Sequence, residues 1–141
     1  KPFLIKPNQE EAEHVIGSSI VTMADAAEAC RELHFMGASN VLLSLGEQGS
    51  IYFNGEKMYR ARAEKILATN TVGAGDSLLA GFIGKFKAGP VKALATGVAW
   101  SSAAITSRGT GISTLPTSIP TELISEIDPK EASLREEQLS Y

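Results

Sequence analysis

The chain has 141 residues, of which 43% are hydrophobic and 21% charged, so it can bury one core and a single domain is expected. Its 13 lysine and arginine residues are outnumbered by 16 acidic ones, and the formal net charge of -3 argues against a surface built to bind nucleic acid or an anionic membrane. No apolar run reaches the length of a membrane span and no secretory signal peptide opens the chain, while the single cysteine, Cys30, can form no internal disulfide; we therefore expect a cytoplasmic protein.

The first third of the chain alternates patterns typical of strands and helices. Residues 1–7 indicate a short buried strand, and residues 8–17 a helix closed by a glycine. A second helix is predicted over residues 22–37, and residues 40–45 have the continuous apolar character of a strand covered on both faces. The second helix carries apolar residues at helical spacing, namely Ala26, Ala29, Cys30, Leu33 and Met36.

A hairpin and a helical pair are predicted next. Two strand-like segments, residues 49–53 and 57–62, flank Asn54-Gly55, a pair suited to the positive φ angles of a tight turn. Helices are expected over residues 76–89 and 90–109, separated at a Gly-Pro pair.

The last third is expected to be less regular. A loop over residues 109–120 leads into a short helix, and the charged tail over residues 129–141 is expected to fray and to present a solvated face. Because helices and strands alternate around a buried strand, the whole pattern predicts a layered α/β domain.

Residues 69–82, TNTVGAGDSLLAGF, carry the strongest chemical signal. A helix that begins near Ala74 leaves its first backbone N–H groups without internal partners, and those of Gly73, Ala74 and Gly75 could converge on an anion with the helix dipole behind them. The spacing matches neither the lysine-containing phosphate loop nor the dinucleotide fingerprint, since Leu78 stands where the third glycine would fall.

Asp76 follows these glycines directly. Its carboxylate is stabilised as an anion in the first turn of a helix and could accept a proton from a substrate hydroxyl as that hydroxyl attacks phosphorus. A base this weak suffices if the proton moves late, because phosphoryl transfer depends mainly on positioning and charge stabilisation. From these residues alone, an aspartate that only starts a helix and glycines that only form a turn are an equally good interpretation.

Four segments of the chain resemble segments of the PfkB, or ribokinase-like, family of carbohydrate kinases, and they follow one another along the chain in the same order as in that family. Residues 70–82, NTVGAGDSLLAGF, resemble the C-terminal signature of that family, and LIKPNQEE resembles its Asn-x-x-Glu segment at the end of a strand. LLSLGEQGS resembles its strand followed by a Thr/Ser-x-Gly-x-x-Gly nucleotide loop, and ALATGVAWSSAAITSRGTGI resembles the helix and loop that close over the adenine. The resemblance spans residues 1 to about 115 and implies a ribokinase-like layered α/β/α domain.

The resemblance implies ATP-dependent phosphoryl transfer to a hydroxyl of a sugar or sugar phosphate. Asp76 matches the catalytic base of the family, and Gly73, Ala74 and Gly75 match its anion hole. A non-catalytic nucleotide-binding or regulatory module on the same scaffold is the alternative. Asp76 favours the enzyme, because a pure binding site would gain from a neutral residue facing the phosphate.

The remaining matches concern the nucleotide and its metal ion. Lys6 and Asn8 match positions near the nucleotide phosphates, and Glu11 matches a glutamate that helps to hold Mg²⁺ through water. Taken alone, Asn8 followed three residues later by Glu11 is more typical of a helix-capping pair. The nucleotide loop and the adenine side are matched by Ser44, Gly46, Gly49, Trp100 and Ala103. Taken singly, the loop glycines are also typical of a turn, and a tryptophan is more often a core residue.

Three further expectations follow from the resemblance. Some members of the family bind a monovalent cation beside the anion hole, and the matching positions are Asn70, Val72, Thr106 and Gly111, with Asn70 standing where the family often has an acidic residue.

The motifs look closest to the branch of 1-phosphofructokinases and tagatose-6-phosphate kinases, which implies a ketose phosphate such as fructose 1-phosphate or tagatose 6-phosphate as substrate. Because family kinases carry an upstream half with most of the sugar contacts and a lid, residues 1–141 are expected to be the C-terminal, nucleotide-binding portion of one ribokinase-like domain. This portion would be a poor catalyst by itself and would need the N-terminal half as a partner, with a homodimer as a further option.

Overall fold

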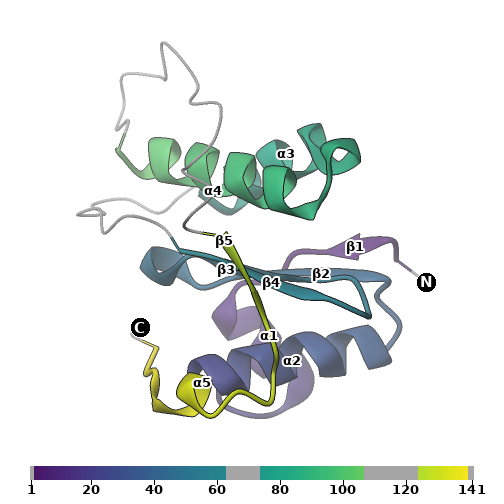
Figure 1. The fold of residues 1–141 in the computed structure, drawn as a ribbon, viewed down its shortest axis with the longest axis vertical. Coiled ribbons are helices and arrows are strands. Elements are labelled where there is room, and N and C mark those ends of the chain that lie inside the picture. Colours follow the sequence, from purple (N-terminus) through teal and green to yellow (C-terminus); the bar gives the residue numbers. More distant parts are fainter. Residues whose placement is uncertain (1, 63–73, 107–123, 140–141) are drawn as a thin grey trace. The chain divides into compact units, whose positions relative to one another are not determined.

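The computed structural model describes residues 2–62, 74–106 and 124–139, in which helices and strands alternate as expected (Figure 1). The strands form one sheet in the order β1-β2-β3-β4-β5. The chain divides into two compact units, residues 1–60 with 126–141 and residues 61–125. In chain order the elements are β1 (Leu4–Ile5), α1 (Gln9–Ile16), α2 (Met23–Phe35), β2 (Asn40–Ser44), the 3₁₀ turn η1 (Gly46–Gln48), β3 (Ser50–Phe53), β4 (Met58–Ala61), α3 (Ala74–Gly84), the 3₁₀ turn η2 (Phe86–Ala88), α4 (Pro90–Thr106), β5 (Ile124–Ile127) and α5 (Ser133–Glu136).

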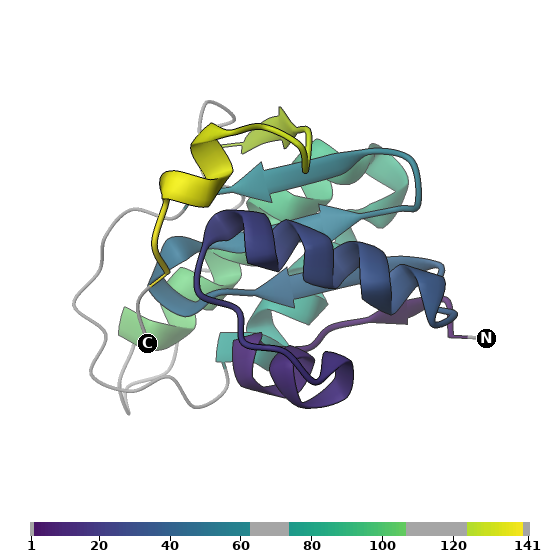
Figure 2. The same cartoon turned by 90° about the horizontal axis from the view of Figure 1, so that it is seen from below.

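In the first unit, helices α1, α2 and α5 lie on one face of the strands (Figures 1 and 2). β1 pairs with β2 in parallel, whereas β2 pairs with β3 antiparallel. Alternate side chains of a strand point to the same face, so Val41, Leu43 and Ile51 meet the helices in one buried cluster. The buried side of α2 supplies Ala26, Ala29, Cys30 and Leu33 to that cluster, as predicted.

Both N-terminal helices begin at the side-chain caps that their sequences contain. Asn8 caps α1, and Thr22 caps α2 in a reciprocal pair with Asp25. α1 ends at Gly17, whose φ of 74° is a left-handed conformation that costs glycine little. Met36 was expected on the buried face of α2, but it follows the last helical turn and is 62% exposed.

Two strand predictions need comparison with the structure. β1 was expected to be buried, yet Leu4 and Ile5 are only half-buried, because β1 ends the strand order and has a strand on one side only. β2 does match its prediction, since its first four residues are buried.

The turn between β3 and β4 works differently from the prediction. Only Gly55 has a positive φ, of 97°, and Asn54 does not. Instead, the Asn54 side chain accepts hydrogen bonds from the backbone N–H groups of Glu56 at 2.9 Å and Lys57 at 2.8 Å. The His34 ring fills the place where a side chain at position 55 would stand, since a Cβ there would come within 2.7 Å of the ring.

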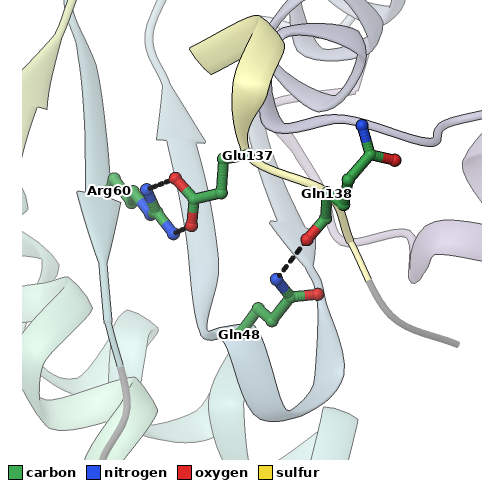
Figure 3. A network of polar contacts seen from close by, with 4 residues as sticks. All are labelled: Gln48, Arg60, Glu137 and Gln138. Atoms are coloured by element: carbon green, nitrogen blue, oxygen red, sulfur yellow. Dashed lines mark hydrogen bonds and ion pairs between the residues drawn. The ribbon is translucent and has the colours of Figure 1, made fainter. Parts of the chain in front are cut away.

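The C-terminal tail differs most from its prediction. A strand, β5, occupies part of the region where a short helix was expected, and the tail beyond it is packed rather than frayed. Leu134 and Leu139 belong to the buried cluster, at 4% and 7% exposure. Glu137 pairs with Arg60 of β4 instead of facing water alone (Figure 3).

In the second unit, α3 and α4 pack against each other. α3 begins at Ala74, as predicted, but ends at Gly84, and the separate turn η2 covers part of its predicted C-terminal end. Gly89, with φ of 104°, precedes Pro90, the first residue of α4, where a missing N–H costs nothing. The loop predicted over residues 109–120 lies outside the described residues. Among the residues that are described, no helix combines the length and the apolar character that a membrane crossing requires.

Candidate functional site

Asn8 and Ser44 lie side by side just where the first two strands end. β1 and β2 run in parallel, and their pairing continues beyond the strands as a single parallel bridge between Asn8 and Ser44. The backbone N–H of Ser44 donates to the carbonyl oxygen of Pro7 at 3.0 Å. In open α/β sheets, ligands bind in the crevice outside the carboxyl ends of the strands. The structure therefore brings two predicted site residues together at the edge of the sheet where a ligand is expected.

Asn8 and Glu11 form the capping pair that their spacing permits. The Asn8 side chain accepts a hydrogen bond from the Glu11 N–H at 2.8 Å, and the Asn8 N–H donates to Glu11 Oε1 at 3.2 Å. The capping interpretation is thus confirmed. Both residues are exposed, so the cap fixes the first turn of α1 while leaving their polar atoms accessible from solvent.

The glycine loop, residues 44–49, is a compact turn. The N–H of Leu45 donates to the Gly49 carbonyl at 2.9 Å, and the N–H of Gly49 donates to the Gly46 carbonyl at 3.2 Å. Gly46 and Gly49 both have positive φ angles, of 59° and 91°, so the turn interpretation of these glycines is confirmed. A Cβ at Gly46 would meet nothing within 4 Å, and the backbone there can be approached closely.

Lys6 is half-buried between β1 and Asn8. Lys6 thus lies at the same strand end as Asn8. Ser44, on the neighbouring strand, is half-buried too. A lysine, an amide and a hydroxyl at one end of the paired strands, beside a turn in which Gly46 is exposed, provide donors suited to phosphate oxygens.

The second group of predicted residues belongs to the other unit. Ala74 and Gly75 are the first residues of α3, and Asp76 is an exposed residue of its first turn. Gly73 lies outside the described residues. An acidic side chain in the first helical turn is stabilised as an anion by the helix dipole, and its exposure leaves it open to solvent.

α4 carries the residues matched to the adenine side. Trp100 is half-buried, and Ala103 lies three residues further along the same helix. Thr106, one of the positions matched to a monovalent cation, is the last residue of α4. Asn70, Val72 and Gly111 fall outside the described residues.

The sequence interpretation missed the contacts between the glycine loop and the C-terminal tail. Gln48 Nε2 donates to the carbonyl oxygen of Gln138 at 3.2 Å (Figure 3). The two residues are 90 positions apart in the sequence, so no local pattern could have indicated the contact.

The comparison with known families identifies the chain. The model of the pfkB family of carbohydrate kinases matches residues 1–118, and the chain belongs to this family. The family resemblance of the four sequence segments is thereby confirmed.

Individual relatives are similar over much of this chain. A 1-phosphofructokinase from Haemophilus influenzae is 36% identical over 118 residues, which are 82% of this chain and 38% of that protein. A 1-phosphofructokinase from Bacillus subtilis is 39% identical over 83 residues, 59% of this chain and 27% of that protein. The chain therefore spans well under half the length of these relatives.

Solved structures agree with the fold. Phosphofructokinase-2 from Escherichia coli in complex with potassium superposes with a TM-score of 0.70 and 32% identity over 77% of this chain and 36% of that chain. The same enzyme in complex with substrates and products gives a TM-score of 0.67 at 30% identity, covering 73% of this chain and 34% of that chain. The predicted α/β fold of the ribokinase-like sugar kinases is confirmed.

Proposed function

We propose that this chain forms the nucleotide-binding portion of a kinase that transfers a phosphoryl group from ATP to a hydroxyl of a sugar phosphate. The observation that carries the proposal is the pairing of Asn8 with Ser44 at the carboxyl ends of β1 and β2, in a chain of the pfkB family. The 1-phosphofructokinase relatives favour a ketose phosphate, such as fructose 1-phosphate or tagatose 6-phosphate, as acceptor.

Lys6, Asn8 and Ser44 are proposed to bind the phosphates of ATP. The half-buried lysine contributes a positive charge, while the amide and the hydroxyl contribute hydrogen bonds. Gly46 and Gly49 let the nucleotide approach the backbone of the glycine loop, because position 46 has open space where a side chain would begin. Trp100 and Ala103 of α4 are proposed for the adenine side.

Asp76 is proposed as the base of the transfer step. The sugar hydroxyl oxygen forms a bond with the γ-phosphorus, the bond from that phosphorus to the oxygen shared with the β-phosphate breaks, and ADP leaves. The hydroxyl proton passes to the Asp76 carboxylate, which is exposed in the first turn of α3. The backbone N–H groups of Gly73, Ala74 and Gly75 are proposed to hold the migrating group.

The donor set fits a magnesium ion that is held largely by phosphates and water. Among residues 2–62, 74–106 and 124–139, no three His, Cys, Asp or Glu side chains gather into a metal cluster. Mg²⁺ commonly keeps several waters and takes one or two carboxylates plus substrate phosphates, so the exposed Glu11 suffices as the protein contribution. When bound, Mg²⁺ would neutralise part of the charge on the phosphates.

The remaining partners are proposed from relatives. The solved complex of the Escherichia coli enzyme with potassium supports a monovalent cation, for which Asn70, Val72, Thr106 and Gly111 are the matching positions. A tetrameric inhibited form of the same enzyme has been solved, and it supports self-association as an option here. We propose that residues 1–141 act as the C-terminal portion of one ribokinase-like domain and that sugar contacts come from an N-terminal half.

The test compares Asp76→Asn with the unmodified protein. Native polypeptide containing residues 1–141 is purified, its intact mass is measured, and ADP release is followed with Mg²⁺, ATP and each ketose phosphate. Asp76→Asn should lower turnover by a factor on the order of 10² or more while ATP affinity stays within about twofold. Equal turnover in both proteins would exclude Asp76 as the base. ATP binding without turnover on any sugar phosphate would instead favour the non-catalytic nucleotide-binding module.

A further inference from the structure

The C-terminal segment, residues 137–139, runs alongside the start of α2. The backbone N–H of Met23 donates to the Glu137 carbonyl at 2.9 Å, and the N–H of Leu139 donates to the Val21 carbonyl at 2.8 Å. Between these two bonds, Thr22 and Gln138 form an antiparallel bridge. Leu139 is 7% exposed and packs in the main core cluster. The segment is therefore held by backbone bonds and by a buried side chain.

The same segment reaches β4 and the glycine loop from this fixed position (Figure 3). Glu137 and Arg60 form a two-pronged ion pair, with one N–H···O distance of 2.6 Å, and the Arg60 side chain is 4% exposed. The next residue, Gln138, accepts the hydrogen bond from the Gln48 side chain at 3.2 Å. Gln48 is thus tied to a part of the molecule that the core holds in place.

The glycine loop needs such a contact more than an ordinary turn does. Gly46 and Gly49 occupy positive φ angles, but glycine also populates many other conformations, so the loop has little intrinsic preference for the form seen here. A hydrogen bond to a residue outside the loop reduces the number of conformations that the loop populates. A site that is ordered before its ligand arrives loses less conformational entropy on binding.

We propose that the C-terminal segment positions the glycine loop for nucleotide binding, and that Gln48 is the positioning residue through which it acts. The inference rests on the proposed function, which assigns the loop to the phosphates of ATP. The segment lies outside residues 1–118, which the family model matches.

A matched pair of variants tests the proposal in the native polypeptide that contains residues 1–141. Gln48→Met keeps the length of the side chain and removes its donor. Gln138→Ala shortens the partner residue but leaves the carbonyl oxygen that accepts the bond. By calorimetric titration with ATP and Mg²⁺, Gln48→Met should bind about three- to tenfold more weakly, as expected for one lost hydrogen bond, and Gln138→Ala should match the unmodified chain. Thermal unfolding should give the same Tm for all three proteins, which separates positioning from a general loss of stability.

Hydrogen exchange without nucleotide tests the loop separately. The amides of Leu45, Gln48 and Gly49 should exchange about three- to tenfold faster in Gln48→Met, while amides of β2 keep their rates. Unchanged loop exchange, or faster exchange with unchanged ATP affinity, would overturn the positioning role. If the unmodified chain bound no ATP while the loop amides responded as described, the proposed function would fail, and the nucleotide part of this inference would fail with it. The conclusion that the C-terminal segment orders the glycine loop would remain valid.

Discussion

Gly81 of α3 lies directly against Gly97 of α4. A Cβ at Gly81 would come within 2.8 Å of the Gly97 Cα, and a Cβ at Gly97 would come within 2.6 Å of the Leu78 carbonyl oxygen. Real Cβ atoms essentially never approach so closely, so the two helix backbones meet here only because neither residue has a side chain. Asp76 lies on the same helix as Gly81, five positions earlier, and the crossing therefore helps to fix the helix that carries the proposed base.

Gly97→Ala should destabilise the second unit by about 1–2 kcal/mol. Overpacking of a close contact costs about 1–3 kcal/mol, and the better helix propensity of alanine offsets up to about 1 kcal/mol of that cost. Trp100 is the single tryptophan of the chain and lies on α4, so its fluorescence during urea unfolding reports on this unit.

Gly84→Ala is the matched control for that substitution. Gly84 is the last residue of α3, and a Cβ there would meet nothing within 4 Å. Its free energy of unfolding should stay within about 0.5 kcal/mol of the unmodified chain. If both alanine variants unfold at the same urea concentration, the close crossing of α3 and α4 is wrong.

The ion pair between Arg60 and Glu137 joins β4 to the C-terminal segment. The Arg60 side chain is 4% exposed and that of Glu137 29% exposed, and the Arg60 Nε is buried without a hydrogen-bond partner. Glu137→Gln should lower the free energy of unfolding by about 2–4 kcal/mol, because the variant leaves a buried guanidinium without its counter-charge. Urea unfolding followed by circular dichroism measures this loss.

Two further variants test whether burial is the cause. Glu28→Gln breaks an ion pair with Arg31 whose side chains are 54% and 46% exposed, and it should cost no more than about 0.5 kcal/mol. Arg60→Met combined with Glu137→Gln removes the buried charge altogether and should be more stable than Glu137→Gln alone. Equal losses from Glu137→Gln and Glu28→Gln would contradict the burial argument.

The parts of the fold that could be predicted are those with local signals. The caps at Asn8 and Thr22 and the glycine at Gly17 mark helix ends within a few residues of sequence, and the structure places them there. The tail has no comparable signal. Its charged residues are typical of a solvated face. Glu137 is partly buried because it pairs with Arg60, which is 77 positions away in the sequence. β5 is recognisable as a strand only once β4 lies beside it in the sheet.

The residues of the candidate site also fall into those with a local sequence signal and those without one. Asn8 and Ser44 each follow an apolar strand pattern, and parallel strands that end at one edge bring such residues together. Asp76 at the start of a helix was likewise expected from the glycines before it. Gln48 had no such sign, because its contact is with the backbone of Gln138, and a backbone carbonyl leaves no trace in the residue types.

Asp25, in the first turn of α2, gives the chain a testable pH dependence. Partial burial works to raise the pKa of its carboxyl group. Hydrogen bonds from the backbone N–H groups of Thr22 and Val21, both at 3.0 Å, and from the Thr22 side chain outweigh that effect, so the pKa is lowered from its ordinary value of 3.8. The folded state therefore favours the ionised carboxylate more strongly than the unfolded state does.

Asp25→Asn should consequently lower the free energy of unfolding at neutral pH but not in acid. A carboxyl group with a lowered pKa stabilises the fold at pH values above its unfolded pKa of 3.8, and this contribution disappears as the pH falls through the still lower folded pKa. We expect a gap of about 0.5–1 kcal/mol between the two proteins at pH 7, the usual size for a carboxylate at a helix start, and a gap that narrows once the pH drops below 3.8. Urea unfolding at pH 7, 5 and 3 measures it, since these values of pH lie on both sides of the ordinary pKa. A gap that stays constant across the three would show that the amide costs stability through its shape and not through the lost charge.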